Sequence, residues 1–146
     1  MSKKLAVSHI RSAKASHIEW RSDVQGYVAG THIDERKLPL IHTESVFARW
    51  YYTEGQKFSH LQSYKPINLL LEEVFEKYRN LYRVLHTPAV KSHFFQSQNK
   101  IEAQRKAKIN TLQQELFNSS QKLIQATNVL EQEIIQMSDE AFAKLI

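Results

Sequence analysis

Residues 45–55 read SVFARWYYTEG, an aromatic-rich segment that predicts a short helix in the first half of the chain. Its apolar residues recur at the spacing of one helical face, and they are Val46, Phe47, Trp50 and Tyr51. Gly55 follows where a helix commonly ends in a left-handed residue. Because Pro39 fits the first position of a helix, we predict that this helix spans residues 39–53.

Two further helices are predicted on either side of this segment. Residues 4–29 carry apolar side chains at spacings of three and four, which predicts an amphipathic helix that stops at Gly30. A third helix should open at Pro66 and end at His86, because the Thr-Pro pair that follows disfavours helical backbone before the proline. Its broad apolar stripe indicates a core helix.

The remainder of the chain is predicted to be one long helix. Thr87 can cap it and Pro88 fits its first position, and residues 89–146 contain neither glycine nor proline. Its apolar seam follows the coiled-coil spacing, with Glu133 as a misfit, and consists of Ile109, Leu112, Leu116, Ser119, Leu123, Ala126, Leu130 and Met137. Residues 118–120, Asn-Ser-Ser, are the best candidates for a break, because such side chains compete for backbone hydrogen bonds. Ser138 can cap a short terminal helix.

These elements predict an all-α, up-and-down four-helix bundle with a long C-terminal helix that can pair as a coiled coil. The chain is read as a single domain, in which residues 1–87 form one helical region and residues 88–146 supply the long helix. Unbroken to Met137, that helix would be about 75 Å long and would leave its apolar seam in water. Exposed apolar surface of this kind marks an interface, so we expect a homodimer.

Composition excludes several classes of function. The 146 residues contain no cysteine, which rules out disulfides, a cysteine nucleophile and thiolate-bound metals. There is no apolar run of about 18 residues to span a membrane, and the N-terminus lacks the apolar core of a secretory signal. A cytoplasmic protein is therefore expected. The net charge of +5 is spread along the chain, so nucleic acid is not an expected partner, although basic residues occur at Lys91, Lys100, Arg105, Lys106 and Lys108.

Two aromatic motifs together resemble the chemoreceptor zinc-binding (CZB) domain. The first is His17-Ile-Glu-Trp20, and the second is the segment from Phe47 to Gly55. The family pattern is His-x-x-Trp, then Cys-x-(Leu/Phe)-Gly-(Lys/Arg)-Trp, then His-x-x-x-His on a following helix. The matching framework positions, within a resemblance that covers residues 9–85, are Trp20, Phe47, Arg49, Trp50 and Gly55. The resemblance implies a cytoplasmic helical bundle that is attached to bacterial chemoreceptors or diguanylate cyclases and holds zinc between one cysteine and three histidines.

Most of those zinc ligands are replaced in this chain. His17 matches the first ligand, but Ser45 stands at the cysteine position, and residues 61–85 contain no histidine. Depending on the alignment, the last two ligand positions fall on Tyr78 and Tyr82 or on Phe75 and Arg79. Zinc normally requires four ligands of the types Cys, His, Asp or Glu, so we expect no metal and no other cofactor.

Two alternatives remain for His17. A rebuilt metal site would use His17 and His42 with a further ligand, since His42 and Ser45 can share one face of a helix. Otherwise His17 is a buried neutral imidazole, hydrogen-bonded to Ser45 or to a tyrosine hydroxyl, while Phe75, Tyr78 and Tyr82 fill the space of the lost ion. We favour the second interpretation.

The expected function is that of a non-catalytic sensory or regulatory domain in chemotaxis or cyclic-di-GMP signalling, with a chemoreceptor or a diguanylate cyclase as partner. No glycine-rich phosphate loop, nucleophile elbow or zinc-protease motif occurs, so we expect no enzyme. The alternative is a helical structural or adaptor protein that acts through its C-terminal coiled coil. Deleting residues 109–146 would separate the two by removing only the adaptor's binding.

Overall fold

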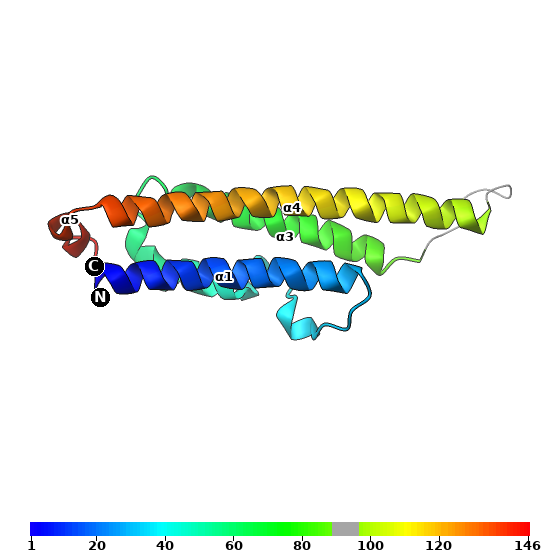
Figure 1. The fold of residues 1–146 in the computed structure, drawn as a ribbon, viewed down its shortest axis with the longest axis horizontal. Coiled ribbons are helices and arrows are strands. Elements are labelled where there is room, and N and C mark those ends of the chain that lie inside the picture. Colours follow the sequence, from blue (N-terminus) through cyan, green and yellow to red (C-terminus); the bar gives the residue numbers. More distant parts are fainter. Residues whose placement is uncertain (89–96) are drawn as a thin grey trace.

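Helices are the only regular elements in residues 1–88 and 97–146, which are the residues that the computed structural model describes (Figure 1). Three helices are long: α1 (Lys3–Val28), α3 (Lys65–Leu85) and α4 (Gln98–Gln136). Two are short, α2 (Val46–Tyr51) and α5 (Asp139–Ala143). Three 3₁₀ turns complete the set, η1 (Glu35–Lys37), η2 (His42–Glu44) and η3 (Glu54–Phe58). The all-α prediction is confirmed for the described residues.

Helix α4 packs against both other long helices and runs antiparallel to them (Figure 1). Lys14 near the middle of α1 donates to Asn128 at 2.7 Å, and Lys3 at its start donates to the carbonyl of Met137. The end of α3 meets the start of α4, where Arg105 donates to the carbonyls of Val84 and Leu85 at 3.1 and 3.0 Å. Both α1 and α3 therefore bury their apolar faces against α4.

The first and third helices form as their sequences predict. Ser2 caps α1 by accepting a hydrogen bond from the amide of Leu5 at 3.0 Å. Gly30, with a φ of 92°, ends this region in the left-handed conformation that favours glycine. Helix α3 ends at Leu85, one residue before the predicted end.

The second helix is much shorter than predicted, and the span of residues 39–53 is wrong. The backbone is extended at Ile41 and again at Ser45, and helical geometry of the α type lasts only for the six residues of α2. Ser45 is the reason for this late start, because its hydroxyl accepts from the amide of Ala48 at 3.1 Å as the helix N-cap. With three long helices and a six-residue α2, the four-helix up-and-down arrangement stays a prediction.

Gly55 is needed for a different reason from the one predicted. Among the described residues the single glycine with positive φ is Gly30, so Gly55 is not a left-handed helix end. A Cβ atom at Gly55 would lie 3.0 Å from the carbonyl oxygen of Trp50 and 3.5 Å from its indole ring. Glycine therefore permits a close approach of the backbone to Trp50.

The long helix begins later than predicted and does not break. Its N-cap is Ser97, whose hydroxyl accepts from the amide of Lys100 at 3.2 Å, and not Thr87. The predicted course of the helix through residues 89–96 lies outside the described residues. From Gln98 the helix runs through the expected break at residues 118–120 and reaches Gln136, about 58 Å for its 39 residues. The predicted break is wrong because Ser119 and Ser120 are buried against the bundle.

The apolar seam of α4 faces the chain's own core. Leu116, Leu123 and Leu130 are each fully buried within the single chain. The misfit Glu133 accepts hydrogen bonds from the amide and the hydroxyl of Ser63, at 3.3 and 2.5 Å, in the turn before α3. The seam therefore gives no reason for self-association, and the homodimer stays a prediction without this support.

The terminal helix was predicted correctly. Ser138 caps α5 by accepting from the amide of Ala141 at 3.1 Å, and Phe142 packs against Phe58 with 6.4 Å between ring centroids. In the part of the chain that the structure describes, no helix has both the length and the apolar character needed to cross a membrane.

Candidate functional site

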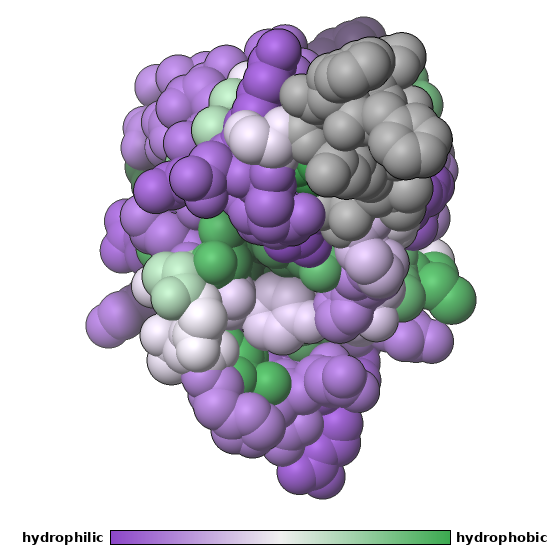
Figure 2. Space-filling model, turned by 90° about the vertical axis from the view of Figure 1, so that its right-hand side faces the viewer, coloured by the Kyte–Doolittle hydropathy of each residue, from purple (hydrophilic) through white to green (hydrophobic). Residues whose placement is uncertain are grey.

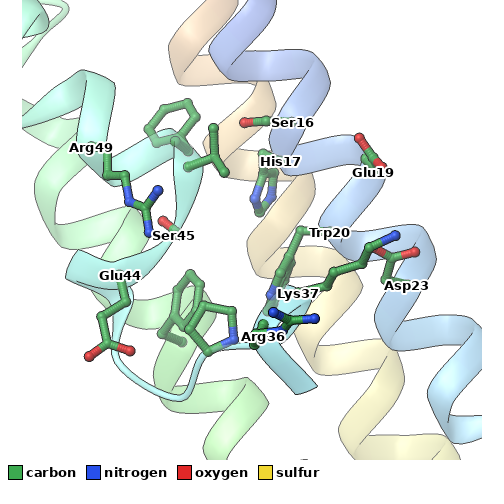
Figure 3. A pocket seen from close by; sticks show the side chains of 14 residues that line it. Ser16, His17, Glu19, Trp20, Asp23, Arg36, Lys37, Glu44, Ser45 and Arg49 are labelled. Atoms are coloured by element: carbon green, nitrogen blue, oxygen red, sulfur yellow. The ribbon is translucent and has the colours of Figure 1, made fainter. Parts of the chain in front are cut away.

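A pocket of about 240 Å³ lies between α1, α2 and the segment that carries η1 and η2 (Figure 3). It brings together several positions that the resemblance to the CZB family singles out, among them His17, Ser45 and Phe47. Trp20 from α1 and Phe75 from α3 also line it. The aromatic motifs of the sequence therefore converge on one cavity, although they come from different elements.

His17 is buried, and its hydrogen-bond partner differs from the predicted one. Its side chain is 3% exposed, and its Nε2 atom lies 2.7 Å from the Oγ atom of Ser120 in α4. The prediction of Ser45 or a tyrosine hydroxyl as partner is therefore wrong. The ring stacks on Trp20 at 5.5 Å and meets Phe47 edge-on at 6.1 Å. These contacts hold the imidazole in one orientation.

Burial keeps His17 in its neutral form. Removal of the ring from water, together with the smaller effect of the nearby charge of Arg21, lowers the pKa of His17 from 6.5 to about 4. At neutral pH the imidazole therefore carries no charge and acts as a hydrogen-bonding group of the core.

The Ser45 hydroxyl makes two local hydrogen bonds. Besides capping α2, it donates to the carbonyl of His42 at 2.9 Å. A hydroxyl supplies one donor, and here it is used within the turn. Ser45 thus has a structural role at the position where the resemblance expects a cysteine ligand.

The structure does not bring Tyr78 and Tyr82 to His17. They line a second cavity of about 320 Å³ together with Tyr27. The end view in Figure 2, over the C-terminal ends of α1 and α3, shows a hollow with apolar side chains in it on an otherwise largely hydrophilic face. Burial raises the pKa of the Tyr78 hydroxyl. Among the described residues, neither tyrosine forms a hydrogen bond with His17 or Ser45. The predicted tyrosine bonds are therefore wrong.

The other alignment puts the last two ligand positions at Phe75 and Arg79, and of these only Phe75 lies near His17. Phe75 lies in the pocket with His17 and packs against Trp20 with 4.8 Å between ring centroids. Arg79 points elsewhere, because its Nη1 atom donates to the carbonyl of Leu40 at 3.1 Å. Phe75 thus lies beside His17, but the expected filled core is not found, because a pocket of about 240 Å³ remains there and Tyr78 reaches only the ring of Trp20.

The rebuilt metal site is not assembled. His42 faces Glu72, with its Nε2 atom 4.0 Å from a carboxylate oxygen, and packs edge-on against Tyr52. Within residues 1–88 and 97–146, no group of three or more His, Cys, Asp or Glu residues could hold a metal ion. His17 and His42 are thus engaged with different partners.

Trp20 carries a feature that its sequence motif does not reveal. The residue is 6% exposed, and its indole Nε1 atom is buried with no hydrogen-bond partner among the described residues. Most buried polar groups are paired, so such an atom requires an explanation. Figure 3 shows the nitrogen-bearing edge of the indole directed toward the end of the pocket where Arg36 and Lys37 lie.

Ser120 was not predicted as a site residue either. Its place in the chain suggested a helix break, and no local pattern links it to His17, which is 103 residues away. Knowledge of the antiparallel pairing of α1 with α4 would have been needed to connect them.

Comparisons with known proteins identify no relative: no family model, no curated protein and no solved structure matches this chain.

Proposed function

We propose that this chain is a non-catalytic regulatory domain, similar in framework to the CZB family, that works without zinc and transmits a signal through helix packing. The single observation that carries the proposal is the hydrogen bond between His17 and Ser120. His17 is the one position of the family's zinc-ligand pattern that still holds a histidine, and this hydrogen bond uses it in a contact between α1 and α4. A residue that would bind metal in the family pattern thus has a packing role.

The surroundings of the pocket support transmission to the long helices. His17 couples the pocket to α4 through Ser120, and Trp20 couples it to α3 through Phe75 and Tyr78, at centroid distances of 4.8 and 5.3 Å. Because the two rings stack on each other, a change in the pocket that moved both would alter the contacts of His17 with α4 and those of Trp20 with α3. Packed cores respond to such changes in discrete steps, since they are dense and poorly compressible.

The proposed setting is cytoplasmic chemotaxis or cyclic-di-GMP signalling, with a chemoreceptor or a diguanylate cyclase as partner. This part rests on the resemblance alone. It is tested by using the tag-free chain to capture cytoplasmic proteins, with a Ser120→Ala bait as a matched control. Recovery of a chemoreceptor or cyclase, unaffected by a zinc chelator, is the expected result. Recovery of unrelated proteins such as ribosomes alone would reject it.

The alternative adaptor function has lost its main motivation, because the α4 seam is internal. Deleting residues 109–146 also does not distinguish the adaptor from the regulatory domain. It would remove Leu116, Leu123 and Leu130 from the core, so loss of binding would follow from unfolding under either hypothesis.

A further inference from the structure

We propose that the pocket between α1 and α2 binds a small organic molecule with an apolar body and one hydrogen-bond acceptor, a carbonyl or a carboxylate, which the indole N–H of Trp20 receives. This inference deepens the proposed regulatory function by naming the class of signal. Binding can nevertheless be measured without any partner protein, so the two proposals can fail separately.

The first ground is the unpartnered donor. The Nε1 atom of Trp20 is buried, and no described protein group accepts its hydrogen. Indole nitrogen acts solely as a donor, so the missing partner must be an acceptor. A buried donor without a partner is unfavourable, and a ligand that supplies the acceptor would remove that cost.

The second ground is the shape and lining of the pocket. Its volume of about 240 Å³ lies just below the roughly 300–1,000 Å³ of pockets for drug-sized ligands, which fits a small molecule. Phe47 and Phe75 give it apolar walls, and both are almost fully buried. Pockets of this composition take an apolar body and use few polar groups to orient it.

The pocket is lined by charged side chains of both signs. Three cations and three carboxylates line it, and they are Arg36, Lys37, Arg49, Glu19, Asp23 and Glu44. Arg36 is already paired with Asp34 at 2.7 Å. With Arg36 paired outside the pocket, two cations and three carboxylates remain in its lining. This lining does not select for an anion, so a carboxylate and a neutral carbonyl can both accept from the Trp20 N–H.

Access to the donor requires a small rearrangement. Trp20 Nε1 is covered by its neighbours, and the nearby η1 turn is only three residues long with no buried residue. The side chain of Arg36 is 90% exposed. Exposed side chains cost less to displace than groups of a packed core, so entry of the ligand from the side of η1 would leave α1 folded.

The test uses nuclear magnetic resonance on the full chain labelled with ¹⁵N. The sequence has two tryptophans, so two indole N–H signals are expected, and Trp20→Phe and Trp50→Phe each assign one by its loss. The probes are benzoate, benzamide and toluene, which share a ring and differ in the acceptor. If one variant fails to fold, the other still assigns both signals.

We expect benzamide, benzoate or both to shift the Trp20 indole signal in a saturable manner while the Trp50 signal moves little. Toluene should bind more weakly, and Trp20→Phe should weaken binding of the acceptor probes roughly three- to tenfold. A response to benzamide alone would identify a neutral carbonyl, and a response to benzoate alone a carboxylate. No shift with either acceptor probe at millimolar concentrations, or an indole N–H bonded to water only, would overturn the inference.

Discussion

The Nε2 atom of His17 in α1 and the Oγ atom of Ser120 in α4 lie 2.7 Å apart inside the bundle, although the two residues are 103 positions apart in the sequence. Ser120 is fully buried and His17 nearly so. Each side chain is a polar group that would otherwise be unsatisfied in an apolar core, and each removes that cost for the other. The pair therefore fixes the register of α1 against α4 at the level of the pocket.

Replacing Ser120 by alanine should destabilise the protein by about 1–3 kcal/mol, because it leaves the buried Nε2 atom of His17 unpaired. Ser119→Ala is the matched control, since Ser119 is also buried in α4. Urea unfolding of both variants at pH 7 measures the difference. Equal losses of unfolding free energy would show that the hydrogen bond does not hold the two helices.

Stability should fall as the pH drops from 6.5 toward 4. The folded-state pKa of His17, about 4, lies below its ordinary value of 6.5, so the unfolded chain takes up the proton first. The stability that neutral His17 contributes is thus complete above pH 6.5 and is lost progressively below it, up to about 3 kcal/mol. Urea unfolding at a series of pH values measures this slope.

His17→Gln should reduce the slope of unfolding free energy against pH between 4 and 6.5, because glutamine does not titrate. His60→Gln, at an exposed histidine, should leave it unchanged. The prediction fails if both variants keep the slope of the parent protein, since the titrating group would then lie elsewhere.

The two glycines at positions 55 and 26 should respond to alanine in opposite directions. Gly55→Ala places a Cβ atom 3.0 Å from the carbonyl of Trp50 and should cost about 1–3 kcal/mol. At Gly26 the nearest atoms would be at ordinary contact distances of 3.7 Å, so Gly26→Ala should stabilise α1 by up to about 1 kcal/mol. Thermal unfolding measures both, and similar shifts of the melting temperature would contradict the close approach at Gly55.

Leu123→Ala should destabilise the isolated chain by about 2–5 kcal/mol, because Leu123 is fully buried in the core. The control Val129→Ala, on the same helix but 59% exposed, should change stability by less than about 0.5 kcal/mol. Unfolding measured at several protein concentrations shows whether the seam is buried within one chain or pairs two chains. A concentration-dependent midpoint for the parent protein would instead indicate pairing between chains.

The sequence was most informative where the signal is local. The apolar periods of α1 and α3, the glycine at position 30 and the cap at Ser138 each depend on neighbouring residues, and the structure confirms them. The α2 error has a local cause as well. Ser45 suits an N-cap, and this local signal marks the start of α2 where Pro39 does not.

The remaining features depend on contacts between distant segments. The seam of α4 has the spacing of a coiled coil, but a bundle helix buries a similar stripe, and sequence spacing alone does not say which chain covers it. The partner of His17 and the unpaired indole of Trp20 follow from how α1, α3 and α4 face one another. The convergence of His17, Ser45 and Phe47 on one pocket could be anticipated from the motifs, whereas Ser120 could not.

The most direct test of the proposed metal-free regulatory site is the zinc content of the chain purified without a tag. With His17 bonded to Ser120 and Ser45 committed to the cap of α2, we predict less than about 0.1 zinc ion per chain, because a closed zinc site needs four ligands. A chelator should likewise leave the melting temperature unchanged. One zinc ion per chain, lost in His17→Ala, would contradict this account of the site.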